Sequence, residues 1–316
     1  MRFAFILDPL ADLKAYKDTS LAIMREASKR GHELSIAMQG GLLLRHDQVK
    51  LISQPFTFAD GTEWHSLGDF EETALGDFDA VLMRKDPPFD NEYLYSTYLL
   101  ELAAEQGARV LNNPRSIRDW NEKLAIASFP QFAPEFLVTC DMELIRQFLA
   151  EHGDIVVKPL DGMGGSGVFH LVTQGPNIGV ILETSTDFGR RTVMAQRYLP
   201  QILQGDKRII MIDGEPLPHA LARIPKAGET RGNLAAGGTG VAQPLTARDR
   251  EIAHHVGAVL KQKGLFLVGL DVIGDYLTEI NVTSPTGMVE IAAQTDCNPA
   301  SVFLDTLEKA TLEKAV

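Results

Sequence analysis

The sequence contains little cysteine, no long apolar run and fewer basic than acidic side chains. Its two cysteines, Cys140 and Cys297, lie far apart and outside any Cys-x-x-Cys spacing, which argues against a disulfide framework and against a zinc site. The longest apolar runs, such as residues 265–270, are much shorter than a membrane span, and Asp8 interrupts the N-terminal apolar run too early for a secretory signal. These absences predict a cytoplasmic location and no membrane partner.

The charge balance argues against another class of partner. The chain has 30 Lys and Arg residues against 42 Asp and Glu residues, a formal net charge of −12, so we expect neither nucleic acid nor an acidic membrane to bind. Any binding of anions must come from local clusters of Arg and Lys. Because 45% of the 316 residues are hydrophobic, the chain can form two or three cores, and we predict a multidomain globular protein.

Strands and helices alternate over the first 120 residues. Runs of apolar residues predict strands, and apolar residues spaced three and four apart predict helices. The predicted strands are 3–7, 34–38, 80–83 and 109–111, and the predicted helices are 19–30 and 92–106. This alternation predicts an α/β domain with a parallel sheet. No Gly-x-Gly-x-x-Gly follows the first strand, which argues against dinucleotide binding in this domain.

The pattern changes at Asn121, where a second unit is predicted to begin. Its elements are a helix from 121, a strand at 136–138, a helix at 142–152 and strands at 155–159 and 194–199. A strand at 207–212 and a return strand up to 222 are joined by a turn at 213–214. A helix is predicted from Thr246 to Gly264, and the last helix begins at Asn298-Pro299. Residues 225–240 contain five glycines without an apolar period, which predicts a mobile loop of the kind that acts as a lid.

Residues 271–282 form the most informative stretch, an apolar hairpin that carries carboxylates. Side chains alternate along a strand, so Glu279 and Asn281 share one face. A two-residue loop at 274–275 would pair position 271 with 278 and turn Asp271 away, whereas a three-residue loop through Tyr276 places Asp271 opposite Glu279. We predict the three-residue loop.

Carboxylates that are held together without compensation persist mainly where a hard cation lies between them. We therefore predict that Asp271, Glu279 and Asn281 bind Mg²⁺ that carries a nucleotide, with Mn²⁺ as a substitute ion. The alternative is an exposed hairpin with ordinary polar side chains.

A glycine-rich loop, residues 161–167, follows a strand that ends near Lys158. Glycines let consecutive N–H groups converge on one oxygen, and a lysine supplies the cation that phosphate oxygens need. The loop lacks the Gly-Lys-Ser/Thr of a Walker motif, and a flexible connector is the alternative. Its place before the acidic hairpin favours ATP, with phosphate contacts from Lys158, Gly162, Gly164, Gly165, Ser166 and Gly167.

Residues 194–200 form an extended segment that ends at a proline. Such a segment can link two lobes and expose backbone groups to an adenine ring, and an ordinary strand is the alternative. Asp206 could accept a hydrogen bond from a ribose hydroxyl or cap a turn.

Three arginines surround the predicted mobile loop. Arg208 and Arg223 lie on the two strands before it and Arg231 lies within it. Arginine suits carboxylates and phosphates, so these residues are candidates for stabilising a charged transition state. Surface ion pairs are the alternative.

Further candidates for substrate binding follow the first-domain strands and the hairpin. Arg84 follows a strand, where open α/β sheets bind ligands, and Ser284, Thr286 and Gly287 could offer hydroxyl and N–H groups to a carboxylate. Asp18 and Ser20 are also candidates. Helix caps and a plain turn are the alternatives.

Several ordered segments resemble bacterial glutathione synthetase over nearly the whole chain. They are Asn121-Glu-Lys, Val157-Lys-Pro-Leu-Asp-Gly-Met-Gly-Gly, Arg223-Ile-Pro, Glu229-Thr-Arg-Gly-Asn-Leu-Ala-Ala-Gly-Gly, Gly269-Leu-Asp, and Glu279-Ile-Asn-Val-Thr-Ser-Pro-Thr-Gly. Asp8-Pro and Arg84-Lys-Asp-Pro-Pro-Phe-Asp extend the match into the first third. Residues 40–75 and the far C-terminus match least.

The resemblance implies an α/β chain with the ATP-grasp fold and three parts. These are an N-terminal Rossmann-like (pre-ATP-grasp) domain at 1–120, a central lid subdomain at 121–199, and a C-terminal ATP-grasp domain at 200–316 with the metal site and the mobile loop 224–240. The resemblance also implies that Lys123 and Lys158 hold the ATP phosphates, with Gln196, Tyr198 and Leu199 at the adenine and Asp206 at the ribose. A homo-oligomer, either a dimer or a tetramer, is expected for the same reason.

The implied reaction is ATP-dependent peptide-bond formation between γ-glutamylcysteine and glycine, through an acyl phosphate, giving glutathione, ADP and phosphate. One alternative is a ligase for another carboxylate and amine, such as D-alanine or glutamate. A nucleotide-binding regulatory protein of the same fold would be expected to lack a lysine or a metal ligand, and both kinds are present. A small-molecule kinase would need no glycine.

Overall fold

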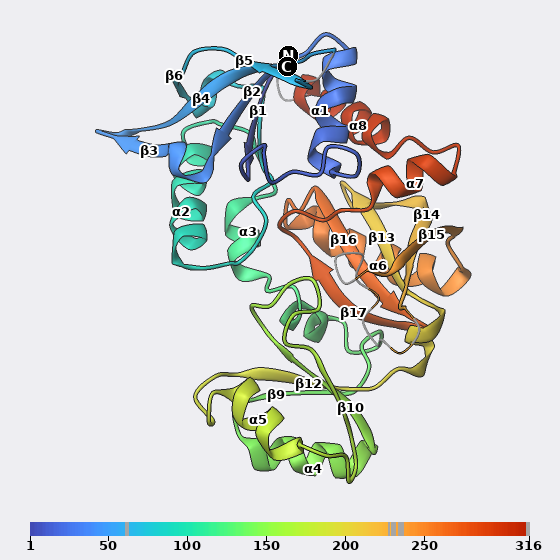
Figure 1. Cartoon of the computed structure of the whole chain (residues 1–316). Helices are drawn as coiled ribbons and strands as arrows, with labels where there is room; N and C mark the ends of the chain where they lie inside the picture. Colours follow the sequence, from blue (N-terminus) through green and yellow to red (C-terminus); the bar gives the residue numbers. More distant parts are fainter. Residues whose placement is uncertain (61–62, 227, 229–231, 233–236, 314–316) are drawn as a thin grey trace.

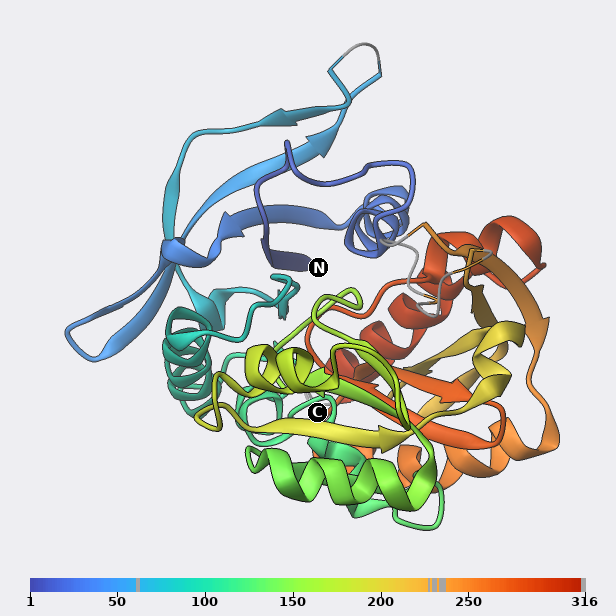
Figure 2. The same cartoon turned by 60° about the horizontal axis from the view of Figure 1, so that its bottom comes forward.

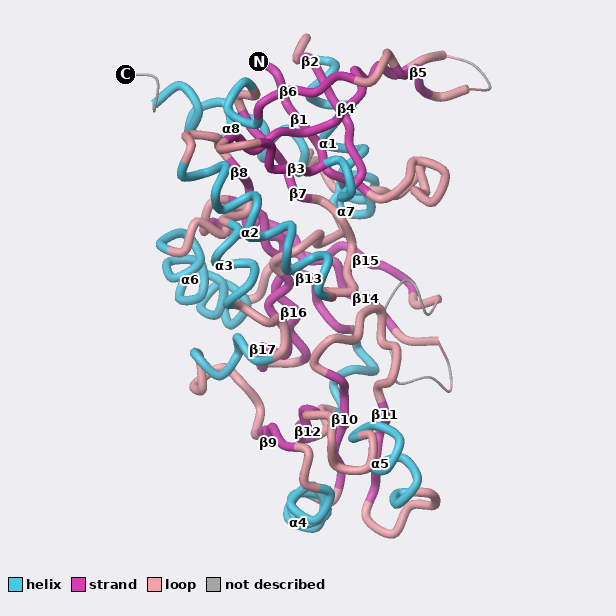
Figure 3. Tube along the Cα trace, turned by 90° about the vertical axis from the view of Figure 1, so that its left-hand side faces the viewer, coloured by secondary structure: helices cyan, strands magenta, loops and turns pink. Residues whose placement is uncertain are grey.

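The chain forms three β-sheets, and the third sheet in the sequence lies between the first and the second in space (Figures 1 and 3). A computed structural model describes residues 1–60, 63–226, 228, 232 and 237–313. In Figure 1 the first sheet is at the top, the last sheet in the middle and the second sheet at the bottom. No helix of this described part is long and apolar enough to cross a membrane.

The first sheet has the strand order β3-β4-β2-β1-β7-β8, and β5 and β6 also pair with β4. Its strands are β1 (Arg2–Leu7), β2 (Glu33–Met38), β3 (Leu42–Arg45), β4 (Gln48–Phe58), β5 (His65–Leu67), β6 (Glu71–Ala74), β7 (Ala80–Met83) and β8 (Val110–Leu111). Its neighbouring helices are α1 (Thr19–Lys29), α2 (Asn91–Glu105) and α3 (Pro114–Asp119). The four predicted strands are confirmed and pair in parallel.

The antiparallel strands between residues 42 and 74 were not predicted. Strand β4 alternates buried and less buried residues only as far as Pro55, and this proline obscures the period-two pattern. The first sheet is therefore mixed, and the prediction of a purely parallel sheet is wrong for this half of it.

The second sheet is antiparallel, in the order β11-β10-β12-β9. It contains β9 (Phe136–Thr139), β10 (Asp154–Pro159), β11 (Phe169–Val172) and β12 (Val193–Arg197), with helices α4 (Met142–His152) and α5 (Ile178–Thr186). The predicted helix from Asn121 is only the 3₁₀ helix η3 (Leu124–Ser128). Figure 2 shows α4 along one face of this sheet.

The third sheet is antiparallel, in the order β15-β14-β13-β16-β17. It contains β13 (Asp206–Ile212), β14 (Glu215–Ile224), β15 (Thr239–Pro244), β16 (Leu267–Ile273) and β17 (Tyr276–Asn281), and the helices are α6 (Ala247–Gln262), α7 (Met288–Gln294) and α8 (Pro299–Glu313). Thr246 and Asp249 form the capping box of α6. Half of the predicted mobile loop 225–240, including Arg231, lies outside the described residues, and β15 begins at Thr239.

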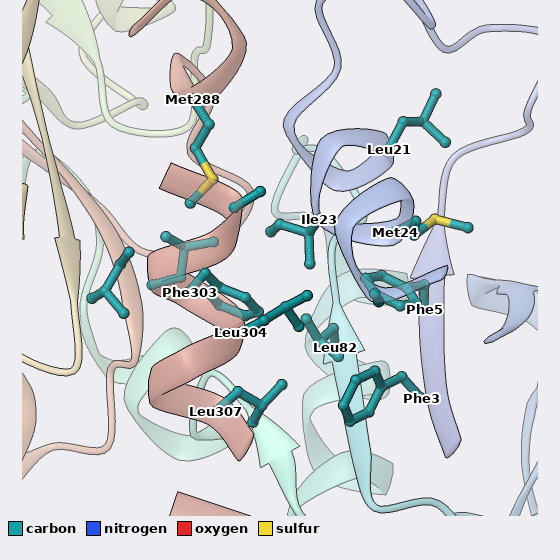
Figure 4. Close-up of a cluster of buried hydrophobic side chains, with 14 of the residues drawn as sticks. Phe3, Phe5, Leu21, Ile23, Met24, Leu82, Met288, Phe303, Leu304 and Leu307 are labelled. Carbon is teal, nitrogen blue, oxygen red and sulfur yellow. The ribbon is translucent and has the colours of Figure 1, made fainter. Parts of the chain in front are cut away.

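The last helix packs against the first sheet. Phe303, Leu304 and Leu307 of α8 are buried in one cluster with Phe3 and Phe5 of β1, and Figure 4 shows these side chains facing one another. The two ends of the chain therefore share one hydrophobic core.

Phe303→Ala is expected to lower the free energy of unfolding by about 3–5 kcal/mol, because it removes a ring that is fully buried in this core. Urea denaturation measures the loss. The control is Val302→Ala on the neighbouring, partly exposed position, where a change within about 0.5 kcal/mol is expected. Equal losses for both variants would contradict the packing of α8.

Candidate active site

A cavity of about 450 Å³ lies where the three sheets meet, a size typical of sites for small molecules. Its walls come from the loop before α1, the second sheet and the third sheet. The predicted site residues in its lining are Asp18, Lys123, Lys158, Gly162, Gly164, Gly165, Ser166, Gln196, Tyr198, Leu199, Asp206, Arg208, Arg223, Asp271, Glu279, Asn281, Ser284, Thr286 and Gly287. Ser20, Arg84 and Gly167 lie outside this lining, and Arg231 lies outside the described residues.

The acidic hairpin is formed by β16 and β17, and its turn differs from the prediction. Ile273 pairs with Tyr276, so the loop has two residues, and the predicted three-residue loop is wrong. The register then shifts between Asp271 and Val272. Thr278 is the extra residue of this β-bulge, and the shift still places Asp271 opposite Glu279, as predicted.

Asp271 is buried and paired with two arginines. Its carboxylate accepts from Nε and Nη2 of Arg208 at 2.6 and 3.0 Å, and Oδ2 lies 2.9 Å from Nη2 of Arg223. Burial alone would raise the pKa of Asp271, but the charges and hydrogen bonds of Arg208 and Arg223 outweigh burial and lower it. The prediction that this carboxylate is uncompensated is therefore wrong, because β13 and β14 supply its counter-ions.

The oxygen atoms at this end of the cavity fit a hard divalent cation. Asp271, Glu279 and Asn281 line the cavity together, and Nδ2 of Asn281 donates to Asp271 Oδ2 at 3.2 Å and to the Gly269 carbonyl at 3.2 Å. The amide oxygen of Asn281 is thereby left as an acceptor. Two carboxylates and an amide oxygen are the donor types that Mg²⁺ and Ca²⁺ take. Among the described residues, no group of three His, Cys, Asp or Glu side chains is placed to hold a metal, so Asn281 is needed for a three-ligand set.

Two buried lysines face this acidic end. Nζ of Lys158, on β10, donates to Oε1 of Glu279 and to the Thr278 carbonyl, both at 3.3 Å. Nζ of Lys123 donates to Glu122 and, at 2.7 Å, to the Gly162 carbonyl. Burial would lower the pKa of Lys123, but the charges of Glu279 and Glu122 outweigh burial and raise it. The Lys123 ammonium group therefore stays charged beside the glycine-rich loop.

The backbone of the glycine-rich loop requires glycine at several positions. Gly164, Gly165 and Gly167 have positive φ angles of 61°, 80° and 69°, which disfavour other residues. A Cβ atom at Gly162 would lie 2.6 Å from Cγ of Pro159. The loop therefore has a backbone shape that larger side chains would disturb.

Two buried polar atoms of the cavity lining have no described partner. Nε2 of Gln196 and Oδ1 of Asp206 are buried and accept or donate no hydrogen bond among the described residues. Burial raises the pKa of Asp206 to about 7, although Arg223, which donates to its Oδ2, opposes this rise. An unsatisfied donor and acceptor suit a polar ligand, because leaving them unpaired is costly.

Arg84 and Ser20 make contacts within the protein. Nε of Arg84 donates to Oγ of Ser20 at 3.0 Å, and Nη2 donates to the Pro285 carbonyl at 2.9 Å. Asp18 accepts from the Leu21 N–H at 2.8 Å as the N-cap of α1, and Ser284 donates to Asp86. Arg84 thus fixes the 283–286 segment against the first sheet, which places Thr286 and Gly287 in the cavity wall.

The cavity lining contains four acidic residues that were not predicted to be functional, which are Asp12, Asp86, Glu122 and Glu290. Glu122 is the counter-ion of Lys123, and burial raises the pKa of Glu122. Glu290, on α7, lines the cavity with Oε2 buried and without a partner in the described chain. The only feature of the sequence that pointed to Glu290 is the nearby Ser284-Pro-Thr-Gly segment, which was a substrate-binding candidate, because helix α7 was not predicted.

Comparison with protein families gives two matches that together span most of the chain. The model for the prokaryotic glutathione synthetase N-terminal domain matches residues 1–118, and the model for the prokaryotic glutathione synthetase ATP-grasp domain matches residues 122–296. Glutathione synthetase of Nitrosomonas europaea is 60% identical over 99% of each chain. The enzyme of Shewanella oneidensis is 49% identical over 98% of each chain.

Solved structures share the fold at low sequence identity. D-cycloserine synthetase DcsG has a TM-score of 0.68 and 16% identity, covering 98% of this chain and 100% of that one. D-alanyl-alanine synthetase A from Vibrio cholerae has a TM-score of 0.62 and 12% identity, covering 99% of this chain and 98% of that one.

Proposed function

Because the chain belongs to the prokaryotic glutathione synthetase family, we propose that the cavity joins γ-glutamylcysteine to glycine with consumption of ATP. The chain is an ATP-dependent ligase with the ATP-grasp fold, and its products are glutathione, ADP and phosphate. The observation that carries this function is identity of 49–60% to glutathione synthetases over nearly the full length. The cavity supports this function, because two lysines, Lys123 and Lys158, lie near the acidic hairpin.

The family uses ATP with a divalent metal ion, and we propose Mg²⁺ as this ion, with Mn²⁺ as a substitute. Asp271, Glu279 and Asn281 would hold it. When bound, such an ion would neutralise part of the negative charge of the phosphates. All three residues offer only oxygen ligands, which suits Mg²⁺ better than zinc.

The remaining nucleotide contacts are assigned from the cavity. Lys123, Lys158 and the N–H groups of residues 162–167 would hold the phosphates. Nε2 of Gln196, which has no described partner, and the backbone of Tyr198 and Leu199 would face adenine. Oδ1 of Asp206, which also has no described partner, would accept a hydrogen bond from a ribose hydroxyl.

A carboxylate is too poor an electrophile to react with an amine directly, so the γ-phosphate is first transferred to it, and glycine then attacks the acyl phosphate. Arg208 and Arg223 would stabilise the transferred phosphoryl group and the oxyanion that follows. We assign Arg231 and the loop 224–240 to the same step, where closure of a lid would exclude water. Arg231 and seven other residues of that loop lie outside the described residues.

Glu290 is proposed to hold an ammonium group of the substrate. Its buried oxygen lacks a partner, and it lies beside Thr286 and Gly287 in the cavity wall. Both substrates carry an ammonium group, but the amine of glycine must lose its proton to react. Glu290 is therefore assigned to the α-ammonium group of the γ-glutamyl residue, while Thr286 and Gly287 would face a substrate carboxylate.

Glu290→Gln is expected to raise KM for γ-glutamylcysteine about 10- to 100-fold, because it replaces a charged hydrogen bond by a neutral one. KM for glycine and kcat should change much less. Steady-state kinetics with each substrate varied separately measures both values, and Glu251→Gln on the exposed face of α6 is the control. An equal rise in KM for glycine would contradict the assignment.

Three further features are proposed from the family. The chain divides into parts at 1–120, 121–199 and 200–316, it assembles as a dimer or a tetramer, and it acts in the cytoplasm. Size-exclusion chromatography with light scattering tests the assembly.

Phosphate release tests the function itself. We expect release with ATP, γ-glutamylcysteine and glycine together, and much less with D-alanine or with glutamate and an amine. Omission of glycine should stop steady release, because the acyl phosphate has no acceptor. Steady ADP formation without glycine would indicate a kinase, and no turnover with any pair would favour a regulatory protein.

A further inference from the structure

One carboxylate oxygen of Asp271, Oδ2, is already fully occupied by contacts within the protein. Oδ1 accepts from Nε of Arg208, and Oδ2 accepts from Nη2 of Arg208, Nη2 of Arg223 and Nδ2 of Asn281, at distances between 2.6 and 3.2 Å. A carboxylate offers about four lone-pair positions. Since each carboxylate oxygen offers about two of these positions, the three contacts to Oδ2 leave that oxygen, which lies beside Asn281, without an acceptor position for a cation.

The two other proposed ligands differ from Asp271. Asn281 uses its two N–H donors and keeps its amide oxygen as an acceptor. Glu279 is partly exposed and contacts Lys158 through Oε1 at 3.3 Å, which leaves Oε2 without a partner among the described residues. Asp271 is therefore the ligand whose partners must change before three residues can hold one ion.

The two arginines hold Asp271 unequally. Arg208 forms a two-pronged contact and also donates to the Thr286 carbonyl at 3.3 Å. Arg223 reaches Asp271 through the single nitrogen Nη2, which also donates to Asp206. A guanidinium group suits phosphate as well as carboxylate. Phosphates that enter the cavity would therefore displace Arg223 from Asp271 more readily than Arg208.

We propose that Arg223 keeps a divalent ion off Asp271 until nucleotide phosphates draw its guanidinium group away. The inference rests on the proposed function, because it needs the phosphates of a nucleotide within reach of Arg223. Ion and nucleotide then bind with positive coupling, and each improves the affinity for the other by the same factor. In the nucleotide-free protein, Arg223 acts as the internal counter-ion in place of the metal.

The test is the affinity for Mn²⁺ alone, measured by electron paramagnetic resonance of the free ion. Arg223→Gln is expected to bind Mn²⁺ without nucleotide about tenfold or more tightly than the unchanged protein, because a charged hydrogen bond to Asp271 is removed. Arg208→Gln removes two of the four contacts and should show a gain in the same direction, while Arg223 remains to compensate Asp271. Arg190→Gln makes the same charge change at an exposed pair with Asp187, and it should alter the affinity less than twofold.

The same titrations with a non-hydrolysable ATP analogue separate the outcomes. We expect the analogue to tighten Mn²⁺ binding by at least tenfold in the unchanged protein and by much less in Arg223→Gln. If both arginine variants bind Mn²⁺ alone no more tightly than the unchanged protein, while the analogue still promotes binding, the inference is overturned and the proposed function stands. If Mn²⁺ does not bind even with the analogue, the metal assignment fails and the inference falls with it. Circular dichroism of each variant confirms that its fold is retained.

Discussion

Glu279→Ala is expected to lower kcat for glutathione formation by about a thousandfold or more, since it removes a proposed metal ligand and the partner of Lys158. Asp271 and Asn281 would remain, so the proposed site would keep only one carboxylate for the ion. The measurement is the steady-state rate of phosphate release with saturating γ-glutamylcysteine and glycine. Undiminished activity at ordinary magnesium concentrations would count against the metal site.

Two further variants identify the source of the loss. Glu279→Gln keeps the size of the side chain and one oxygen, so partial activity at high Mn²⁺ concentration would assign the loss to metal binding. Glu135→Ala removes a mostly exposed carboxylate paired with Arg197, and its kcat should remain within about twofold of the unchanged value. A comparable loss in Glu135→Ala would show that charge alone, and not the site, accounts for the effect.

The faces of the acidic hairpin could be predicted from alternation, but its register could not. Alternation along β17 places Glu279 and Asn281 on one face whatever the loop length. The position of Asp271 depends on a β-bulge at Thr278, where Oγ1 donates to the Asp271 carbonyl at 3.1 Å. One contact at the bulge comes from a distant segment, since Lys158 donates to the Thr278 carbonyl at 3.3 Å, and a contact of this kind cannot be predicted from the sequence of the hairpin alone.

Contacts between distant segments explain the other differences. Individual elements such as α4 and β7 could be predicted because their apolar spacing is local. The packing of α8 on β1 and the counter-ions of Asp271 join residues far apart in the sequence. Chemistry of single residues predicts that Asp271 needs a cation nearby, but not that the nearest cations are two arginines of the same chain.

Arg223→Ala is expected to lower kcat by about 100- to 1,000-fold, because Arg223 is proposed to stabilise charge that develops during phosphoryl transfer. The dissociation constant of the ATP analogue should rise by no more than about threefold, since the two lysines and the glycine-rich loop would still hold the phosphates. Rapid-quench measurement of ADP formation and calorimetric titration of the analogue give the two values. A loss confined to nucleotide affinity would instead assign Arg223 to ground-state binding.

Arg223 is proposed to affect both the rate of the reaction and the binding of the metal ion. The same substitution that lowers kcat should strengthen binding of Mn²⁺ to the nucleotide-free protein, because it removes one of the three contacts to Oδ2 of Asp271. If Arg223 only supported the fold, its substitution would lower turnover and metal affinity together. The same joint loss would follow if the substitution acted by disturbing Asp206, the other partner of Arg223. Arg190→Ala, at an exposed pair, is the control and should change neither value. Opposite changes in turnover and in nucleotide-free metal affinity at Arg223 would therefore distinguish a direct role in the reaction from loss of structure.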